Sequence, residues 1–170
     1  LTAQDGTLND HFGGSVAMTD DTIVVGATGE FYYSNHAAYI YKKPLNGWAT
    51  TSNYTAKLTA SGTNDYFFGR SVSISNNTIV VGGASSAYVF DEPPAGWITT
   101  LTETAKLTDA DGSEDEFGYS VAVDENRIVV GAPFDDIDGI SNKGSAYVYL
   151  RPKAGWKTTS NENAKISASD

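Results

Sequence analysis

Carboxylates gather at two places in this chain of 170 residues, and both groups have side chains that a calcium ion prefers. The first group lies in residues 109–115, where oxygen-bearing side chains alternate around a glycine that permits a sharp turn. Its candidate ligands are Asp109, Asp111 and Asp115. A solvated turn is the alternative, because Asp and Gly are good turn residues and the run lacks the full calcium-loop pattern with its terminal glutamate.

The second group lies in residues 133–142 and contains Asp135, Asp136 and Asp138. Three carboxylates so close in sequence repel one another unless water or a cation screens them. Calcium binding and a mobile acidic loop therefore both remain open for this segment.

Aromatic side chains form the other candidate binding sites. Residues 29–36 contain Phe31, Tyr32, Tyr33 and His36, which could stack on a sugar, anchor a protein partner, or pack down onto the fold. Three tryptophans, each preceded by glycine, recur at one register and suit either a repeated sugar site or a packing position at a corner: Trp48, Trp97 and Trp156.

Catalytic chemistry has little support in the sequence. The two histidines, His11 and His36, have no nucleophile at a recognisable spacing, and the chain has no cysteine. No glycine-rich phosphate loop or nucleophile elbow is present. A carboxylate pair for glycoside hydrolysis could hide among the 21 acidic residues, but we predict a protein that is not an enzyme.

Composition limits the partners. The formal charge of −10 and the isoelectric point near 4.4 argue against nucleic acid and anionic membranes, which attract basic surfaces. A hydrophobic content of 40% is enough for a packed core, and no apolar run is long enough for a membrane helix. Because the chain begins within a repeat, we expect it to be an excised or processed piece.

The elements that must position these residues come from one pattern that occurs three times. Each copy contains Phe-Gly-x-Ser-Val, a Val-Val-Gly, an Ala-Tyr, a Gly-Trp and an Ala-Lys, in that order. The interval from Val-Val-Gly to Ala-Tyr changes length between copies, whereas the other spacings are fixed. We place the repeats approximately at residues 1–57, 58–106 and 107–165, with 166–170 starting a further unit.

Each repeat predicts four strands. A strand that begins at the Ser-Val leads through two turn-forming residues into a wholly apolar strand, which predicts burial on both faces, and an aromatic strand and a short Ala-Lys strand follow. Such meanders, covered on both sides, are typical of β-propeller blades stacked face to face. The predicted fold is therefore all-β, with four-stranded antiparallel blades in three repeats, as a partial propeller or a segment of an assembly.

The Phe-Gly, paired with the downstream Gly131-Ala132-Pro133 and its variants at Gly26 and Gly82, resembles the FG-GAP repeat, which builds the propeller head of integrin α chains. The resemblance covers nearly the whole chain and implies an extracellular or cell-surface protein. Integrin-type repeats often hold calcium between their first two strands, but here only two-residue turns occupy that position, so that site is not expected.

Closed propellers have roughly four to eight blades, whereas this chain has three repeats. Three arrangements are therefore open: the chain is part of a longer propeller, two copies close a ring, or many copies add head-to-tail into a filament. The predicted function is adhesion or protein interaction, including self-association through open blade edges. A carbohydrate-binding lectin that uses the tryptophans or the tyrosine-rich loop is the alternative.

Overall fold

The computed structural model describes residues 1–29, 36–62, 66–100, 102–110 and 115–169. These residues form three antiparallel sheets of four strands each, and each sheet comes from one sequence repeat. We call the sheets blades 1, 2 and 3. The described chain contains no helix long and apolar enough to cross a membrane. The predicted all-β fold with four-stranded blades is confirmed.

The strands follow the same order in every blade. Blade 1 contains β1 (Phe12–Met18), β2 (Thr22–Ala27), β3 (Ala37–Lys42) and β4 (Ala56–Leu58). Blade 2 contains β5 (Ser71–Ser75), β6 (Thr78–Gly82), β7 (Ala87–Asp91) and β8 (Ala105–Leu107). Blade 3 contains β9 (Ser120–Asp124), β10 (Arg127–Ala132), β11 (Ser145–Leu150) and β12 (Ala164–Ser167).

The predicted two-residue turns join the first two strands of each blade. Ser75 pairs with Thr78 across Asn76 and Asn77, and Asn76 has a φ of 51°. The corresponding residue of blade 3, Glu125, has a φ of 47°. Asn tolerates this left-handed conformation, and the tight turn fixes the register that sends alternate side chains to opposite faces of the blade.

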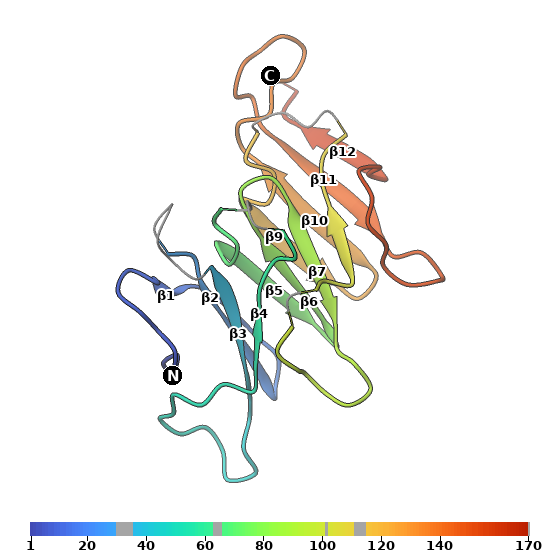
Figure 1. Ribbon diagram of the computed structural model, residues 1–170. Coiled ribbons are helices and arrows are strands. Elements are labelled where there is room, and N and C mark those ends of the chain that lie inside the picture. The colour runs from blue at the N-terminus through green and yellow to red at the C-terminus, as the bar shows by residue number, and fades with distance from the viewer. Residues whose placement is uncertain (30–35, 63–65, 101, 111–114, 170) are drawn as a thin grey trace.

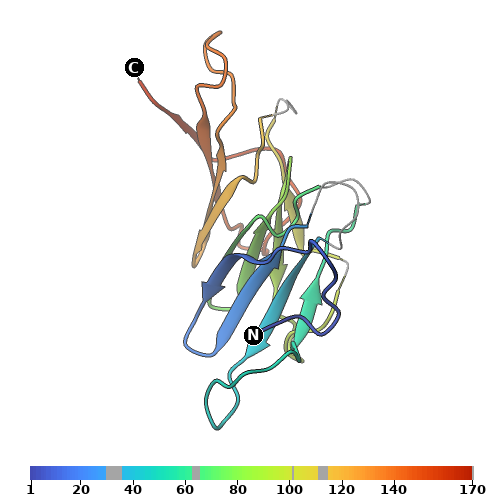
Figure 2. The ribbon, with the colours of Figure 1, turned by 90° about the vertical axis from the view of Figure 1, so that its left-hand side faces the viewer.

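The blades follow one another in a row, with blade 2 between the other two, and the chain termini lie at opposite ends of the row (Figures 1 and 2). Their first strands are neighbours: β5 contacts both β1 and β9. Apolar side chains fill each gap between blades. One buried cluster joins Val24, Ile40 and Leu58 of blade 1 to blade 2, and another joins Val80, Val89 and Leu107 of blade 2 to blade 3.

The second strand shows which blades are covered on both sides. All five residues of β6 are buried, and β2 is buried apart from one half-buried residue. The prediction of burial on both faces is wrong for β10, where Ile128 and Val130 are buried but Val129 is 36% exposed. The reason is that Val129 lies on the face of blade 3 that no other described blade covers.

Glycines allow the blades to approach closely. Gly69 and Gly118, each next to the repeated Phe, have φ values of 95° and 104°, as expected for a position that favours glycine. An added Cβ on Gly26 would overlap the carbonyl oxygen of Gly69, and one on Gly82 would overlap that of Gly118. The two blades thus meet with backbone against backbone.

We call each of these contacts between neighbouring blades a joint, and each joint contains a hydrogen bond from a serine. The Ser15 hydroxyl donates to the carbonyl oxygen of Gly69 at 2.7 Å, and the Ser71 hydroxyl donates to that of Gly118 at 3.0 Å. Both serines come from the Phe-Gly-x-Ser motif of the preceding blade. In blade 2, for example, Gly69 of this motif accepts the hydrogen bond from blade 1, and Ser71 of the same motif donates the hydrogen bond to blade 3.

The substitution Gly82→Ala should lower the free energy of unfolding by about 3 kcal/mol, because the new methyl group has to push apart two packed backbones. Gly131→Ala is the matched control, since Gly131 has the same place in blade 3 but its Cβ would mainly meet the rotatable hydroxyl of Ser120. Chemical denaturation measures both. Equal loss in the two variants would contradict this account of the blade joint.

Candidate functional site

The two internal joints show what each face of a blade binds. The face of blade 1 that carries Val24, Ile40 and Leu58 packs against the face of blade 2 that carries Phe68, Ile79, Val81, Tyr88 and Phe90. The same relation holds between blades 2 and 3. We call the first kind of face the tail face and the second kind the head face.

The tail face of blade 3 has no blade on it in the described chain. Ile166 is 57% exposed there, and the whole of β12 is exposed. Its counterparts in the internal joints, Leu58 and Leu107, are fully buried at 0% exposure. Ser120, the counterpart of the two serines that bond to the next blade, is also exposed. This face therefore has the apolar residues and the donor of a joint.

No other blade of the described chain packs on the head face of blade 1. Val16 and Met18 are 67% and 65% exposed, whereas in blade 3 the counterpart of Met18, Val123, is 9% exposed and the counterpart of Val16, Val121, is half-buried. Gly13 has a φ of 93°, like the other Phe-Gly glycines, and nothing lies within 4 Å of where its Cβ would be. The described chain thus presents an uncovered tail face and a partly uncovered head face, where Val25, Tyr39 and Tyr41 are buried but Val16 and Met18 are exposed, at opposite ends of the row of blades.

The tryptophans take part in the joints. Trp97 and Trp156 are each 7% exposed and belong to the apolar clusters between blades 1 and 2 and between blades 2 and 3. Trp48, in the same place on blade 1, is 37% exposed. This burial favours the packing role over a repeated sugar site, and it assigns Trp48 to the uncovered head face.

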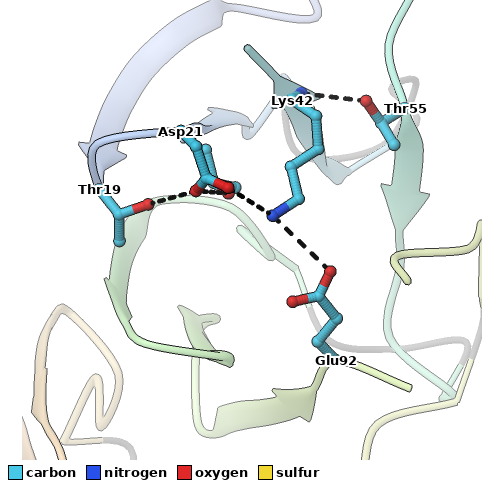
Figure 3. A network of polar contacts seen from close by, with 6 residues as sticks. Thr19, Asp21, Lys42, Thr55 and Glu92 are labelled. Atoms are coloured by element: carbon cyan, nitrogen blue, oxygen red, sulfur yellow. Dashed lines mark hydrogen bonds and ion pairs between the residues drawn. The ribbon is translucent and has the colours of Figure 1, made fainter. Parts of the chain in front are cut away.

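At its partly exposed edge, which we call the rim, each joint has an ion pair between its two blades, and these ion pairs differ between the two joints. Lys42 of blade 1 lies between Asp21 of its own blade and Glu92 of blade 2, with its Nζ 3.7 Å from Glu92 Oε1 (Figure 3). In the next joint the signs are reversed, because Asp91 of blade 2 accepts from Arg151 of blade 3 at 3.0 Å. Such partly exposed pairs add little stability, but they match each blade to its neighbour.

The acidic residues predicted to bind calcium lie in different surroundings. Asp109 and Asp115 are 6% and 4% exposed, and Asp111 lies outside the described residues. Asp136 and Asp138 are exposed, and Asp136 accepts a hydrogen bond from the Asn142 amide at 2.8 Å. No group of three metal-binding side chains occurs in the part of the chain that the structure describes. Calcium binding stays a prediction.

Asp135 is buried at 1% exposure and engaged by its own blade. Its Oδ2 accepts from the Tyr147 hydroxyl at 2.7 Å, from Ser145, and from Lys165 Nζ at 2.8 Å. Burial by itself raises the pKa of Asp135, but the hydrogen bonds from Lys165, Ser145 and Tyr147 outweigh this effect and lower the pKa below its ordinary value. The second and third strands of each blade are joined by the segment whose length differs between the repeats, which we call the variable loop. The Asp135 carboxylate ties the variable loop of blade 3, between β10 and β11, to β11 and β12.

Of the candidates in the variable loop of blade 1, only His36 lies within the described residues. Phe31, Tyr32 and Tyr33 lie outside the described residues, and His36 is half-buried just before β3. Their predicted role in binding stays a prediction. The uncovered faces have contributors that sequence reasoning missed, among them Ser120, Val129 and Ile166. The fixed spacing of the repeats was the signal that could have identified them.

Comparison with known proteins agrees with this architecture. A sequence model described as the FG-GAP repeat matches residues 1–41, 53–90 and 101–149. Seventy chains of solved structures are similar to this chain. One is the crystal structure of the computationally designed Ika4 protein, at 16% identity and a TM-score of 0.52, covering 98% of this chain and 89% of that chain. At this identity the likeness shows the fold alone. No curated protein matches.

The substitution Asp135→Asn should lower the free energy of unfolding at neutral pH by about 2 kcal/mol, because it removes a charge-assisted hydrogen bond to Lys165. The pKa of Asp135 is lower in the folded protein, so this stabilisation is present above the unfolded pKa near 4 and is lost as the pH falls through the folded pKa.

Denaturation between about pH 7 and pH 2 should therefore show that the free energy of unfolding falls less steeply with decreasing pH in Asp135→Asn than in the unchanged protein. Asp138→Asn is the control, because Asp138 is exposed and Asn accepts its φ of 54°. An identical acid-side slope in Asp135→Asn and the unchanged protein would show that the carboxylate contributes nothing to the fold.

Proposed function

Because the chain belongs to the FG-GAP repeat family, and its β-propeller-like blades form a protein-interaction module, we propose that it self-associates through the tail face of blade 3. The partner is a second copy of this chain. The proposed setting is extracellular or at a cell surface, as for the integrin α heads that the repeat resembles, and the biological role is adhesion.

One observation carries this proposal: the same apolar position is fully buried in both internal joints and exposed in blade 3. Leu58 and Leu107 are 0% exposed, whereas Ile166 is 57% exposed. Burying a side chain of this size stabilises a contact by about 1.5–3 kcal/mol. Val129, at 36% exposure, adds to the same surface. Large apolar side chains that gather on one face favour a protein partner.

The chemistry of the tail face favours another blade as its occupant. Ser120 can donate a hydrogen bond to a backbone carbonyl, and Gly131 leaves room for that backbone, as Ser71 and Gly82 do for Gly118. A second copy carries the matching carbonyl on its exposed Gly13. The formal charge of −10 makes nucleic acid a poor competitor for the face.

Light scattering over a range of concentrations tests the proposal. We expect the unchanged protein to form dimers or larger species. Gly131→Ala should weaken association by about tenfold or more, because its methyl group blocks the close backbone approach. Ile166→Lys should abolish association, since a charge would be buried without a partner.

Ile140→Lys is the control, because Ile140 is also exposed, at 53%, but lies in the variable loop of blade 3 and not in the strands that form the tail face. It should associate like the unchanged protein. A monomer at every concentration, or association that Ile166→Lys leaves intact, would overturn the proposed function.

A further inference from the structure

The N-terminal segment, residues 1–5, occupies a place on blade 1 that belongs to the preceding blade in both internal joints. The Thr2 amide donates to the carbonyl oxygen of Thr51 at 3.1 Å. In the internal joints the matching bonds run from Thr59 to Thr100 and from Thr108 to Thr159, each at 3.2 Å. Residues 1–3 therefore lie where the end of a fourth strand lies in the other two joints.

Side chains of blade 1 hold this segment in place. The Tyr41 hydroxyl donates to the Thr2 carbonyl oxygen at 2.7 Å, as the Tyr149 hydroxyl does to that of Thr108 at 2.8 Å. Lys57 forms an ion pair with Asp5 at 2.6 Å. Hydrogen bonds with Lys57 help to lower the pKa of Asp5 against the opposing effect of burial. The segment thus covers part of the head face, and Tyr41 is only 2% exposed.

Residues 166–168 of blade 3 have the same repeat position as residues 1–3. Ile166 and Ser167 end β12, where they pair with Ala146 and Ser145 of β11. When a second copy docks as the internal joints do, its Ser167 reaches the Thr51 carbonyl oxygen that Thr2 already occupies. One acceptor at one place on the blade cannot hold both chain segments.

We propose that two copies join head to tail, and that residues 166–169 of one copy displace residues 1–4 of the next from its head face. This inference rests on the proposed self-association and specifies its second surface, which consists of Gly13, Val16, Met18 and Trp48. Trp48 then covers Ile166 of the other copy, as Trp97 and Trp156 pack in the internal joints.

The rim of this joint differs from the internal ones. The positions of the ion pairs Lys42–Glu92 and Asp91–Arg151 are held here by Leu150 of one copy and Lys43 of the next. Leu150 carries no charge, so no ion pair forms with Lys43 at this position of the rim. The joint is therefore weaker than the internal joints and gains little from low salt. A head-to-tail contact also leaves a free face at each end, so growth continues into a filament unless a ring closes.

Mixing two defective variants separates head-to-tail from tail-to-tail association. Ile166→Lys removes the tail face and keeps the head face, and Met18→Lys does the reverse. Each variant alone should be monomeric, and an equimolar mixture should give a complex of two chains that does not grow, as measured by light scattering. Met18→Lys alone forming dimers would overturn the head-to-tail arrangement while leaving self-association intact.

Loosening the N-terminal segment tests the displacement. Thr2→Pro removes the amide that bonds to Thr51, and Asp5→Ala removes the ion pair with Lys57. Each should strengthen association about fivefold, because the competing segment is held less firmly. Asp138→Asn is the control for Asp5→Ala, since it removes one negative charge from an exposed site in the variable loop of blade 3 and Asn accepts the φ of 54°.

The unchanged protein, Thr2→Pro and Asp5→Ala are compared by their dissociation constants from sedimentation. Equal constants for all three, in a protein that Ile166→Lys makes monomeric, would overturn the displacement and keep the proposed function. An unchanged protein that remains monomeric, with both segment variants monomeric as well, would overturn the proposed function and this inference together.

Discussion

The close backbone contact between successive blades is the constraint on which the rest of the structure depends. Gly26 and Gly82 have no room for a Cβ, because the Phe-Gly carbonyl of the next blade lies against them. Ser15 and Ser71 bond to the same carbonyl oxygens. This contact sets the separation of the sheets, and the apolar side chains of the two faces form one buried cluster in each joint.

We assign one surface chemistry to folding and to the proposed self-association. A tail face that meets the next blade within the chain becomes core, as at Leu58, whereas the tail face of blade 3 leaves Ile166 exposed and is the surface that we propose for binding. Matching between partners then depends on the rim, where Lys42 meets Glu92 but Asp91 meets Arg151. These ion pairs favour the matched neighbour at each joint, while the burial of apolar side chains supplies most of the stability of the joint.

Much of the fold follows from the sequence, because the spacing of Phe-Gly, Val-Val-Gly and Ala-Tyr is the spacing of the paired strands. The turns at Asn76 and Glu125 and the role of the Phe-Gly glycines were predictable for the same reason. Burial was not fully predictable: Val80 and Val129 occupy the same repeat position, yet only Val80 is buried. Likewise, the partners that engage Asp135 come from β11 and β12, more remote in sequence than an acidic cluster can indicate.

Amide hydrogen exchange at increasing protein concentration tests the central claim most directly. The account predicts that protection of β1, β9 and β12 rises with concentration, because the uncovered faces of blades 1 and 3 become joints. Protection of β6, which is buried on both faces in a single chain, should not change. Exchange in β1, β9 and β12 that is independent of concentration would contradict the claim that these faces bind one another.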